Sequence, residues 1–578
     1  MKQKQPTGYP SIDKPWLKYY DEQAWVLQLP QQSLYEHIYS RNKDNMSSNA
    51  LMYFGKRITY KEMFHEIDIV ASAFASIGVK EGEIVSFLMP TIPETIYALY
   101  AVNKIGAIAN MLDLSTNDAF IHDRIKTTKS KCLLVLDALK ERILSLCDDL
   151  AIEKVISISP TNSLPIIDYL SKLKQKKDRS ITSISVAVEW KKFIKLGTQK
   201  NSIRPIPYKK ARPALIVYTG GTTGVPKGAV LSNDGINATI MQLKETGIKS
   251  KPGDRYLDIM PPFIAYGVVC GIHNPLSERQ EIVIIPKLDP IKFPRYIVKY
   301  KPNHIIGVPA LFESMLISPD LKKKKLSFLQ NIICGGDKLS MSSEKKINAF
   351  LSEHQSMAQI AQGFGMTEVG TSVTFTVSHH AELRENHIGI PLVLTNIKIV
   401  VPGTDKELKY NEKGEICIAT PSVMLGYYDN DMETQNVLKK HADGVMWIHS
   451  KDIGYMDTDG ELYFLDRIKR MIVRHDGHNV WPGAIEQIIS THYAVEACTV
   501  IGIKNKDNTN GATVAAVIVL KNEYIEQKIK VLKEIDLMCR ERLPGRDIAQ
   551  VYKTIECIPK TPLGKTDYRA LEEWAAQN

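Results

Sequence analysis

Two kinds of segment alternate along roughly the first 390 residues of the chain. Short apolar runs rich in β-branched residues are typical of buried strands. The longer segments between them carry apolar residues at helical spacing and predict amphipathic helices. This alternation predicts an α/β fold with largely parallel sheets. The predicted strands are Ile84–Met89, Cys132–Asp137, Ala214–Tyr218, Glu281–Pro286, His304–Val308 and Asn331–Cys334, and the clearest predicted helices are Tyr60–Ile77, Ile92–Ile105 and Lys338–Ser352.

After about residue 390 the pattern changes to short strand-like pieces separated by turns. The pieces Ile397–Val401, Gly414–Ala419 and Glu461–Asp466 predict a small antiparallel or barrel-like module. A strand, a glycine-containing loop, a helix that begins near Pro482 and two further β-rich runs follow this module. We therefore predict two domains. They are an N-terminal domain of residues 1–466 and a small C-terminal α+β domain of residues 467–578.

The composition is that of an ordinary globular protein. Of the 578 residues, 44% are hydrophobic and 24% are charged, and the length corresponds to about three to four domain-sized units. The eight cysteines are scattered without a Cys-x-x-Cys pair, which argues against a zinc site and a disulfide framework and suits a reducing compartment. The N-terminal charges precede no apolar signal core, and no uninterrupted apolar run reaches about 18 residues. We therefore expect a cytoplasmic protein without a transmembrane segment.

The formal net charge of +10 is spread over lysine-rich stretches such as Lys172–Lys177 and Lys322–Lys325. Such stretches are typical of a solvated surface. A basic surface that attracts nucleotides, CoA or anionic lipid is the alternative, which leaves peripheral contact with a membrane open. We expect no nucleic-acid partner.

The densest chemical signal is the segment Tyr218–Gly228, which follows a predicted buried strand. It holds four glycines, three threonines and one lysine. Glycines let a ligand approach the backbone N–H groups, threonine hydroxyls add donors, and Lys227 adds a positive charge, so the loop predicts a polyphosphate site. The Walker A pattern requires Ser or Thr after its lysine, whereas Gly228 follows Lys227 here. A magnesium ion must therefore be held elsewhere.

This loop resembles the phosphate-binding signature of the adenylate-forming, AMP-binding superfamily, which includes the acyl-CoA synthetases. Its variant is most similar in style to fatty-acyl-CoA ligases, and further motifs follow in the family order from about residue 35 to the end. The resemblance implies a large α/β domain followed by a mobile C-terminal lid. It also implies that the loop holds the nucleotide phosphates through Thr219, Gly220, Gly221, Thr222, Thr223, Gly224 and Lys227.

The segment Gln362–Glu368 resembles a second family motif. The resemblance implies that Glu368 ligates Mg²⁺, which takes few protein ligands and keeps phosphate oxygens, and that Thr367 contacts the phosphate. Phe364 stands where many members have Tyr, so stacking on adenine is kept while a hydroxyl is lost. The same comparison assigns further nucleotide contacts to Gly335, Gly336 and Asp337 (adenine), Gly365, Asp452 (ribose hydroxyls) and Arg467 (ribose or phosphate).

One departure from the family pattern and the remaining motifs lie toward the C-terminal end of the chain. Many members have Thr-Gly before the ribose aspartate, where this chain has Ser450 and Lys451. The resemblance implies a hinge at Lys469. It also implies a catalytic role for Lys565, which would offset the repulsion between a carboxylate and the α-phosphate. The loop with Gly477 and His478 resembles the one that admits the CoA thiol after domain rotation; a simple helix-start signal is the alternative there.

The segment Met260–Gly267 lies where the family lines its acyl pocket, and its side chains are apolar and aromatic. Amino-acid-activating members place an Asp just after the aromatic residue, where this chain has Ile264 and Ala265, and an unpaired buried ammonium would be costly. We therefore disfavour amino acids as substrates. Predicted acyl-pocket residues are Phe263, Ile264, Gly267, Gly307 and Val308.

Together these features predict an AMP-forming acid–thiol ligase that uses ATP, Mg²⁺ and CoA, with a medium- or long-chain fatty acid as the favoured substrate. Three alternatives stay open. The acceptor is a carrier-protein phosphopantetheine instead of CoA, the acid is aromatic or of another class, or the chain is a non-catalytic nucleotide-binding regulator. Retention of Lys227, Glu368, Asp452 and Lys565 together argues against the regulator.

Overall fold

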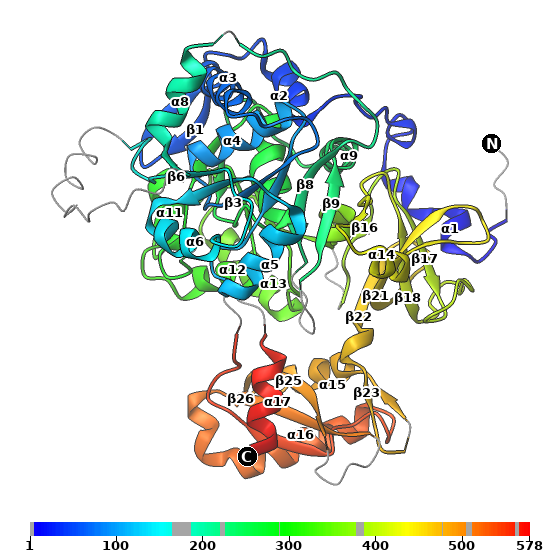
Figure 1. Ribbon diagram of the computed structural model, residues 1–578. Helices are drawn as coiled ribbons and strands as arrows, with labels where there is room; N and C mark the ends of the chain where they lie inside the picture. The colour runs from blue at the N-terminus through cyan, green and yellow to red at the C-terminus, as the bar shows by residue number, and fades with distance from the viewer. Residues whose placement is uncertain are drawn as a thin grey trace.

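The computed structural model describes residues 5–164, 186–200, 202–219, 226–287, 289–376, 386–476, 478–504, 511–560 and 566–577 (Figure 1). In these residues two large sheets and a smaller five-stranded sheet precede a separate C-terminal domain. Figure 1 shows that domain, in orange and red, below the two large sheets. The predicted α/β fold is confirmed.

The first large sheet has eight strands in the order β19-β9-β8-β4-β3-β5-β6-β7. Its strands from β8 to β7 run parallel, and β9 and β19 are antiparallel additions at one edge. The strands are β3 (Ile84–Leu88), β4 (Ile108–Met111), β5 (Cys132–Leu136), β6 (Lys154–Ile158), β7 (Ala187–Glu189), β8 (Pro213–Tyr218), β9 (Gly228–Ser232) and β19 (Gly426–Tyr427).

The second large sheet has nine strands in the order β16-β15-β14-β13-β12-β10-β11-β1-β2. Its central strands are parallel, while β2, β15 and β16 pair antiparallel at the two edges. The strands are β1 (Asn49–Tyr53), β2 (Lys56–Thr59), β10 (Arg255–Asp258), β11 (Glu281–Ile284), β12 (His304–Gly307), β13 (Asn331–Cys334), β14 (Ile360–Gly365), β15 (Ser372–Phe375) and β16 (Ile390–Pro391).

The helices form where the sequence offers start signals. Thr59 and Glu62 make a capping box at the start of α3, and Pro93 opens α4 at the position where its missing N–H costs nothing. All of α4 is buried, and one core cluster draws on both large sheets and the helices between them. The longer helices are α2 (Leu34–Asn42), α3 (Tyr60–Ser76), α4 (Pro93–Lys104), α5 (Asp118–Thr128), α6 (Lys140–Leu146), α8 (Trp190–Thr198), α9 (Asn233–Lys244), α11 (Phe293–Tyr300), α12 (Pro309–Ile317), α13 (Met341–Glu353) and α14 (Asp431–Val437).

The barrel-like module is an antiparallel sheet in the order β17-β18-β21-β20, with β22 paired to β21. The strands are β17 (Asn396–Val400), β18 (Gly414–Ala419), β20 (Leu438–Lys440), β21 (Met446–Met456) and β22 (Leu462–Arg467). A short 3-10 turn, Ile468–Arg470, leads from β22 into the C-terminal domain.

The C-terminal domain packs helices on a three-stranded sheet and has its own apolar cluster. The sequence placed its boundary between residues 466 and 467, which falls at the end of β22; that boundary stays a prediction. The elements are β23 (Ile472–Val473), β24 (Asn479–Val480), α15 (Pro482–Ser490), β25 (Val495–Lys504), β26 (Ala512–Leu520), α16 (Lys528–Arg542), β27 (Val551–Thr554) and α17 (Tyr568–Gln577).

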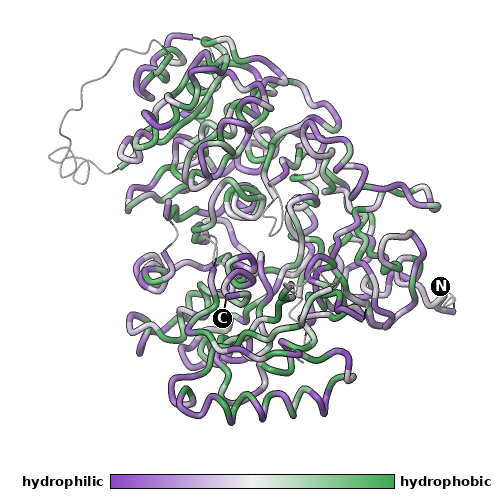
Figure 2. The backbone as a smooth tube through the Cα atoms, turned by 60° about the horizontal axis from the view of Figure 1, so that its bottom comes forward, coloured by the Kyte–Doolittle hydropathy of each residue, from purple (hydrophilic) through white to green (hydrophobic). Residues whose placement is uncertain are grey.

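Hydrophobic and hydrophilic residues alternate over short stretches of the backbone (Figure 2). None of the helices that the structure describes is long and apolar enough to cross a bilayer.

Candidate active site

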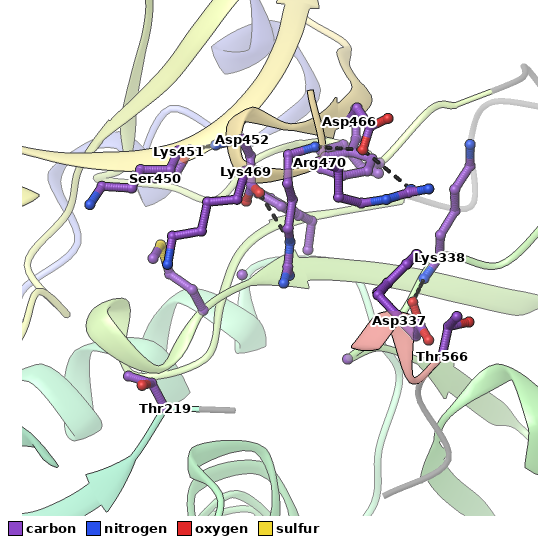
Figure 3. A pocket seen from close by; sticks show the side chains of 18 of the residues that line it. Thr219, Asp337, Lys338, Ser450, Lys451, Asp452, Asp466, Lys469, Arg470 and Thr566 are labelled. Carbon is purple, nitrogen blue, oxygen red and sulfur yellow. Dashed lines mark hydrogen bonds and ion pairs between the residues drawn. The ribbon is translucent and has the colours of Figure 1, made fainter. Parts of the chain in front are cut away.

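One large cavity, of about 1060 Å³, lies where the large sheets, the barrel-like module and the C-terminal domain meet (Figure 3). Most of the described residues that the sequence placed in the site contribute to its wall. They are Thr219, Lys227, Ile264, Val308, Gly335, Gly336, Asp337, Phe364, Gly365, Thr367, Glu368, Asp452, Arg467 and Lys469.

Strand ends position the nucleotide-binding candidates. The strands β8, β13 and β14 end at Tyr218, Cys334 and Gly365, and ligands of α/β sheets bind beyond such carboxyl ends. The backbone N–H of Thr219 donates to the Lys227 carbonyl at 2.9 Å, and Lys227 N–H donates to the Thr219 hydroxyl at 3.2 Å. These bonds close the base of the predicted phosphate loop. Its central residues, including Gly220, Gly221, Thr222, Thr223 and Gly224, lie outside the described residues.

The motif around Phe364 needs a glycine for steric reasons. A Cβ on Gly365 would lie 1.5 Å from the carbonyl oxygen of Thr371, so no other residue fits without moving the backbone. The aromatic ring of Phe364 lines the cavity and lies 6.2 Å from the ring of Phe464. An aromatic face is therefore available for a stacked base.

Lys227 and Glu368 are linked by residues that the motifs did not identify. Lys227 forms an ion pair with Glu433 of α14, and its ammonium lies 5.2 Å from the centre of the Tyr427 ring. The Tyr427 hydroxyl donates to Glu368 Oε1 at 2.6 Å. In the sequence, Tyr427 and Glu433 belong to a tyrosine-rich, acidic stretch that signals only a turn. The two residues reach the site only because β19 pairs with β9 at the edge of the sheet in the folded chain.

The chemistry of Glu368 fits a magnesium ligand. The carboxylate is buried, with 7% of the residue exposed, yet it lines the cavity. A carboxylate accepts about four hydrogen bonds or ligand bonds, so the bond from Tyr427 leaves capacity for an ion. Mg²⁺ is commonly held by one or two carboxylates together with substrate phosphates.

Asp452 and Arg467 face each other across β21 and β22. Arg467 Nε lies 3.3 Å from Asp452 Oδ1. Burial raises the pKa of Asp452 to about 6, against the opposing effect of Arg467 and with a further rise from Glu368. The Ser450 hydroxyl accepts a hydrogen bond from Asp452 N–H at 3.0 Å. Ser450 therefore helps to set the backbone of β21 directly before the aspartate.

The connection between the domains carries several charges. Lys469 lines the cavity within the turn Ile468–Arg470; burial lowers its pKa, and the nearby charges of Lys451 and Lys227 lower it further. Arg470, which the motifs did not single out, forms ion pairs with Asp466 and Glu486 and lies 4.6 Å from the Tyr568 ring of α17. Arg470 therefore ties the start of the C-terminal domain to its last helix.

The acyl-pocket candidates divide into two groups. Ile264 and Val308 lie on the cavity wall, whereas Phe263, Gly267 and Gly307 are not among the described residues that line it. The two glycines permit close packing instead. A Cβ on Gly267 would lie 1.9 Å from the Pro261 carbonyl oxygen, and one on Gly307 would lie 3.0 Å from the Phe312 ring.

The predicted catalytic and CoA residues of the C-terminal domain are only partly described. Lys565 and Gly477 lie outside the described residues. Thr566, directly after Lys565, lines the cavity together with Tyr568. His478 pairs with Asp547 at 2.5 Å and is not among the described wall residues.

A second set of potential metal ligands lies in the barrel-like module. Cys417, His441 and His449 are buried, and one ligand atom of each lies within 4.8 Å of the others. Hydrogen bonding accounts for this set: His449 Nδ1 lies 3.1 Å from Glu415 Oε2, and its Nε2 lies 2.9 Å from His441 Nε2. We therefore assign it a structural role in supporting the part of β21 that carries Asp452.

Comparison with known proteins identifies the family. The chain matches the family model for AMP-binding enzymes over residues 39–428 and the model for the AMP-binding enzyme C-terminal domain over residues 484–565. A long-chain-fatty-acid–CoA ligase of Bacillus subtilis (strain 168) is 27% identical over 98% of this chain and 99% of its own length. A probable 4-coumarate–CoA ligase 1 of Dictyostelium discoideum is 28% identical over 82% of this chain and 83% of its length.

The fold agrees with these matches. The crystal structure of ATP-bound MatB from Rhodopseudomonas palustris superposes with a TM-score of 0.79 at 20% identity, covering 94% of this chain and 99% of MatB. Because the first family model alone spans more than half of the chain, the protein belongs to the AMP-binding enzymes of the adenylate-forming superfamily, the family of the AMP-forming CoA ligases.

Proposed function

We propose that this enzyme is an ATP- and Mg²⁺-dependent acid–thiol ligase that converts a medium- or long-chain fatty acid to an acyl-adenylate and then to acyl-CoA. One observation carries the proposal. The described phosphate-loop residues, Glu368, the Asp452–Arg467 pair and the residue after Lys565 share one cavity with an apolar wall. The match to the fatty-acid ligase over nearly the whole chain supports the substrate class.

In the first half-reaction a carboxylate oxygen of the acid attacks the α-phosphorus of ATP. A new oxygen–phosphorus bond forms while the bond to the pyrophosphate oxygen breaks, and pyrophosphate leaves with the electron pair. Two anions meet, so positioned cations rather than a protein nucleophile lower the barrier. In this proposal Lys227 and Thr367 contact the phosphates, Asp452 accepts from the ribose hydroxyls and Lys565 bridges the carboxylate and the α-phosphate. Mg²⁺, which Glu368 would hold, neutralises phosphate charge when bound.

In the second half-reaction the CoA sulfur attacks the acyl carbon, the thiol proton is released, and AMP leaves with the electrons of the acyl–oxygen bond. The loop with Gly477 and His478 is proposed to line the entry of the thiol. Because His478 is held by Asp547 away from the described cavity wall, this role requires the C-terminal domain to rotate about Lys469.

The apolar wall supports a flexible acid. Ile264, Val308 and Tyr266 face the cavity, and a smaller cavity of about 60 Å³ also touches Tyr266. Apolar and aromatic side chains, including Tyr256, Ile306 and Phe375, contribute to the wall of this smaller cavity. The Tyr266 hydroxyl donates to the Ile333 carbonyl at 3.2 Å. Tyr266 therefore stands between the two spaces and sets how far an acyl tail reaches.

Replacing Tyr266 with alanine is expected to shift the preference toward acids that are longer by several methylenes, because the two cavities then join. Each additional buried methylene contributes about 0.8 kcal/mol, so two methylenes favour the longer acid by roughly tenfold. The measurement is kcat/KM across a series of straight-chain acids. An unchanged length profile in a folded variant would contradict the proposed course of the tail.

The proposed function is tested by pyrophosphate release against a panel of fatty, aryl and amino acids, with and without CoA. Acyl-CoA formation from a fatty acid supports the proposal. Preference for a coumarate-like acid would replace the substrate class, and product on a holo-carrier protein but not on CoA would replace the acceptor. If no acid in the panel supports ATP–pyrophosphate exchange, the chain is not a ligase of these acids.

The raised pKa of Asp452, about 6, predicts a pH dependence of nucleotide binding. If the ionised carboxylate accepts from the ribose hydroxyls, KM for ATP rises about tenfold between pH 7.5 and pH 5, because the protonated fraction grows to nine tenths. Asp452→Asn is expected to raise KM for ATP at every pH and to remove this pH dependence.

The same pKa shift acts in the opposite direction on the free energy of unfolding. The folded state holds the Asp452 proton more tightly than the unfolded chain does, so the stabilisation that this carboxyl contributes falls as pH rises from about 4 to 6.

A further inference from the structure

Lys451 has a backbone conformation that favours glycine. Its φ is 62°, in the left-handed region that side chains with a Cβ adopt at an energetic cost. Its surroundings hold it there: the Lys451 N–H donates to Glu415 Oε1 at 3.1 Å, and Glu415 is itself held by His449. Non-glycine residues keep such conformations where the surrounding structure holds them in place, and they cluster at active sites and ligand-binding sites.

The side chain of Lys451 contributes to the wall of the large cavity. In Figure 3, Lys451 of β21 and Lys469 of the turn Ile468–Arg470 lie on the same side of the cavity, above Thr219. Lys227 also lines this cavity, paired with Glu433. The hydrogen bond from Lys227 lowers the pKa of the Glu433 carboxyl, and the charge of Lys451 lowers it further. The charges of Lys451, Lys227 and Glu433 also act on Lys469, so the four charged groups form one cluster.

Positive charge is in excess around Glu433. Lys227 forms an ion pair with this carboxylate, and the charge of Lys451 acts on it as well. The Tyr427 ring lies beside the Lys227 ammonium, and its hydroxyl donates to a separate carboxylate, that of Glu368. Like charges gathered in a partly desolvated cavity are costly unless an anion joins them. An anion with several negative charges, bound where Thr219 and Lys227 close the base of the phosphate loop, balances this excess of positive charge.

We infer that Lys451 is a further phosphate-binding residue, which contacts the phosphate chain of ATP before adenylation and pyrophosphate as it leaves. The inference rests on the proposed function for the identity of the anion. The ligand chemistry is that of a polyphosphate, which a compact ammonium group binds as a point charge. The strained backbone of Lys451 is the means by which the chain places this third ammonium in the cavity.

The test uses Lys451→Gly, because glycine relieves the backbone while it removes the charge. We expect the midpoint of thermal unfolding to stay equal or rise, while the Kd for ATP and the inhibition constant for pyrophosphate both rise about tenfold. Lys451→Asn, which also tolerates a left-handed backbone, should show the same loss. Direct binding of ATP and of pyrophosphate by calorimetry is the readout, together with KM for ATP and for the acid.

Lys323 is a matched control, since it has a φ of 60° in an exposed turn and does not appear among the described wall residues. Lys323→Gly is expected to affect stability in the same way and to leave ATP binding unchanged. Unchanged ATP and pyrophosphate affinities in Lys451→Gly would overturn the inference, and so would a rise confined to KM for the acid. If the wild type binds ATP but performs no acid-dependent exchange, the proposed function fails while the binding test of Lys451 still stands.

Discussion

Replacing Lys565 with alanine is expected to slow acyl-adenylate formation about 100- to 1000-fold, the usual loss when one donor to a developing charge is removed. The reason is electrostatic: the attacking carboxylate and the α-phosphate repel each other, and a lysine that donates to both offsets the repulsion. Thr566, the next residue in the chain, lies on the wall of the cavity that Lys227 and Glu368 share. The measurement is pyrophosphate release in a single turnover with acid and ATP.

The second half-reaction separates this role from general damage. Lys565→Ala should still convert supplied acyl-adenylate and CoA to the thioester at nearly the wild-type rate. Lys560→Ala removes a nearby exposed lysine and should leave both half-reactions unchanged. If adenylation survives in Lys565→Ala, or if both half-reactions are lost together, Lys565 does not act as proposed.

The second large effect is expected for Glu368→Gln, which keeps the shape of the side chain and removes its charge. Loss of groups that only support a metal ligand typically costs 10- to 100-fold, so loss of the ligand itself is expected to lower kcat/KM for adenylation by about 100-fold or more. The Mg²⁺ concentration that gives half-maximal activity should rise with it. The experiment is a Mg²⁺ titration of ATP–pyrophosphate exchange.

Two further variants, one with a smaller expected loss and one as a control, test the assignment of Glu368. Tyr427→Phe keeps the Glu368 carboxylate but removes the hydroxyl that donates to it at 2.6 Å, so a smaller loss, of about tenfold, is expected. Glu94→Gln changes a carboxyl that is also buried, with 2% of the residue exposed, but that lies outside the cavity, where it accepts a hydrogen bond from Ser163. An unaltered Mg²⁺ requirement in Glu368→Gln would show that the ion has other ligands.

Local sequence predicted the strands and helices well because their periodicity is repeated within each segment. The predicted strand Asn331–Cys334 is observed with the same bounds, and the predicted helix Tyr60–Ile77 ends one residue earlier, at Ser76. The helix expected from Lys338 begins only at Met341, because Ser340 caps it through its hydroxyl. Such differences arise where a side-chain cap, rather than periodicity, sets the end.

At the predicted acyl pocket the sequence motifs and the observed cavity wall differ. Phe263, Gly267 and Gly307 belong to the segments expected to line it, but the described cavity wall is formed by their neighbours Ile264, Tyr266 and Val308. The segment Tyr266–His273 is a π-helix, whose wider turns change which side chains share a face. Regular helical spacing therefore could not assign the residue of this segment that faces the cavity, Tyr266.

By itself the sequence determined the α/β class and the family, and it predicted which kinds of group would meet a nucleotide, because a glycine-dense loop carries its chemistry within about a dozen adjacent residues. Only the tertiary structure decided which distant groups complete the site. Lys227 meets Glu433 from 206 positions away, Tyr427 reaches Glu368 from 59 positions away, and Lys451 takes its left-handed backbone in contact with Glu415. These contacts depend on how the sheets and the barrel-like module pack, and packing is a property of the whole chain rather than of any one segment.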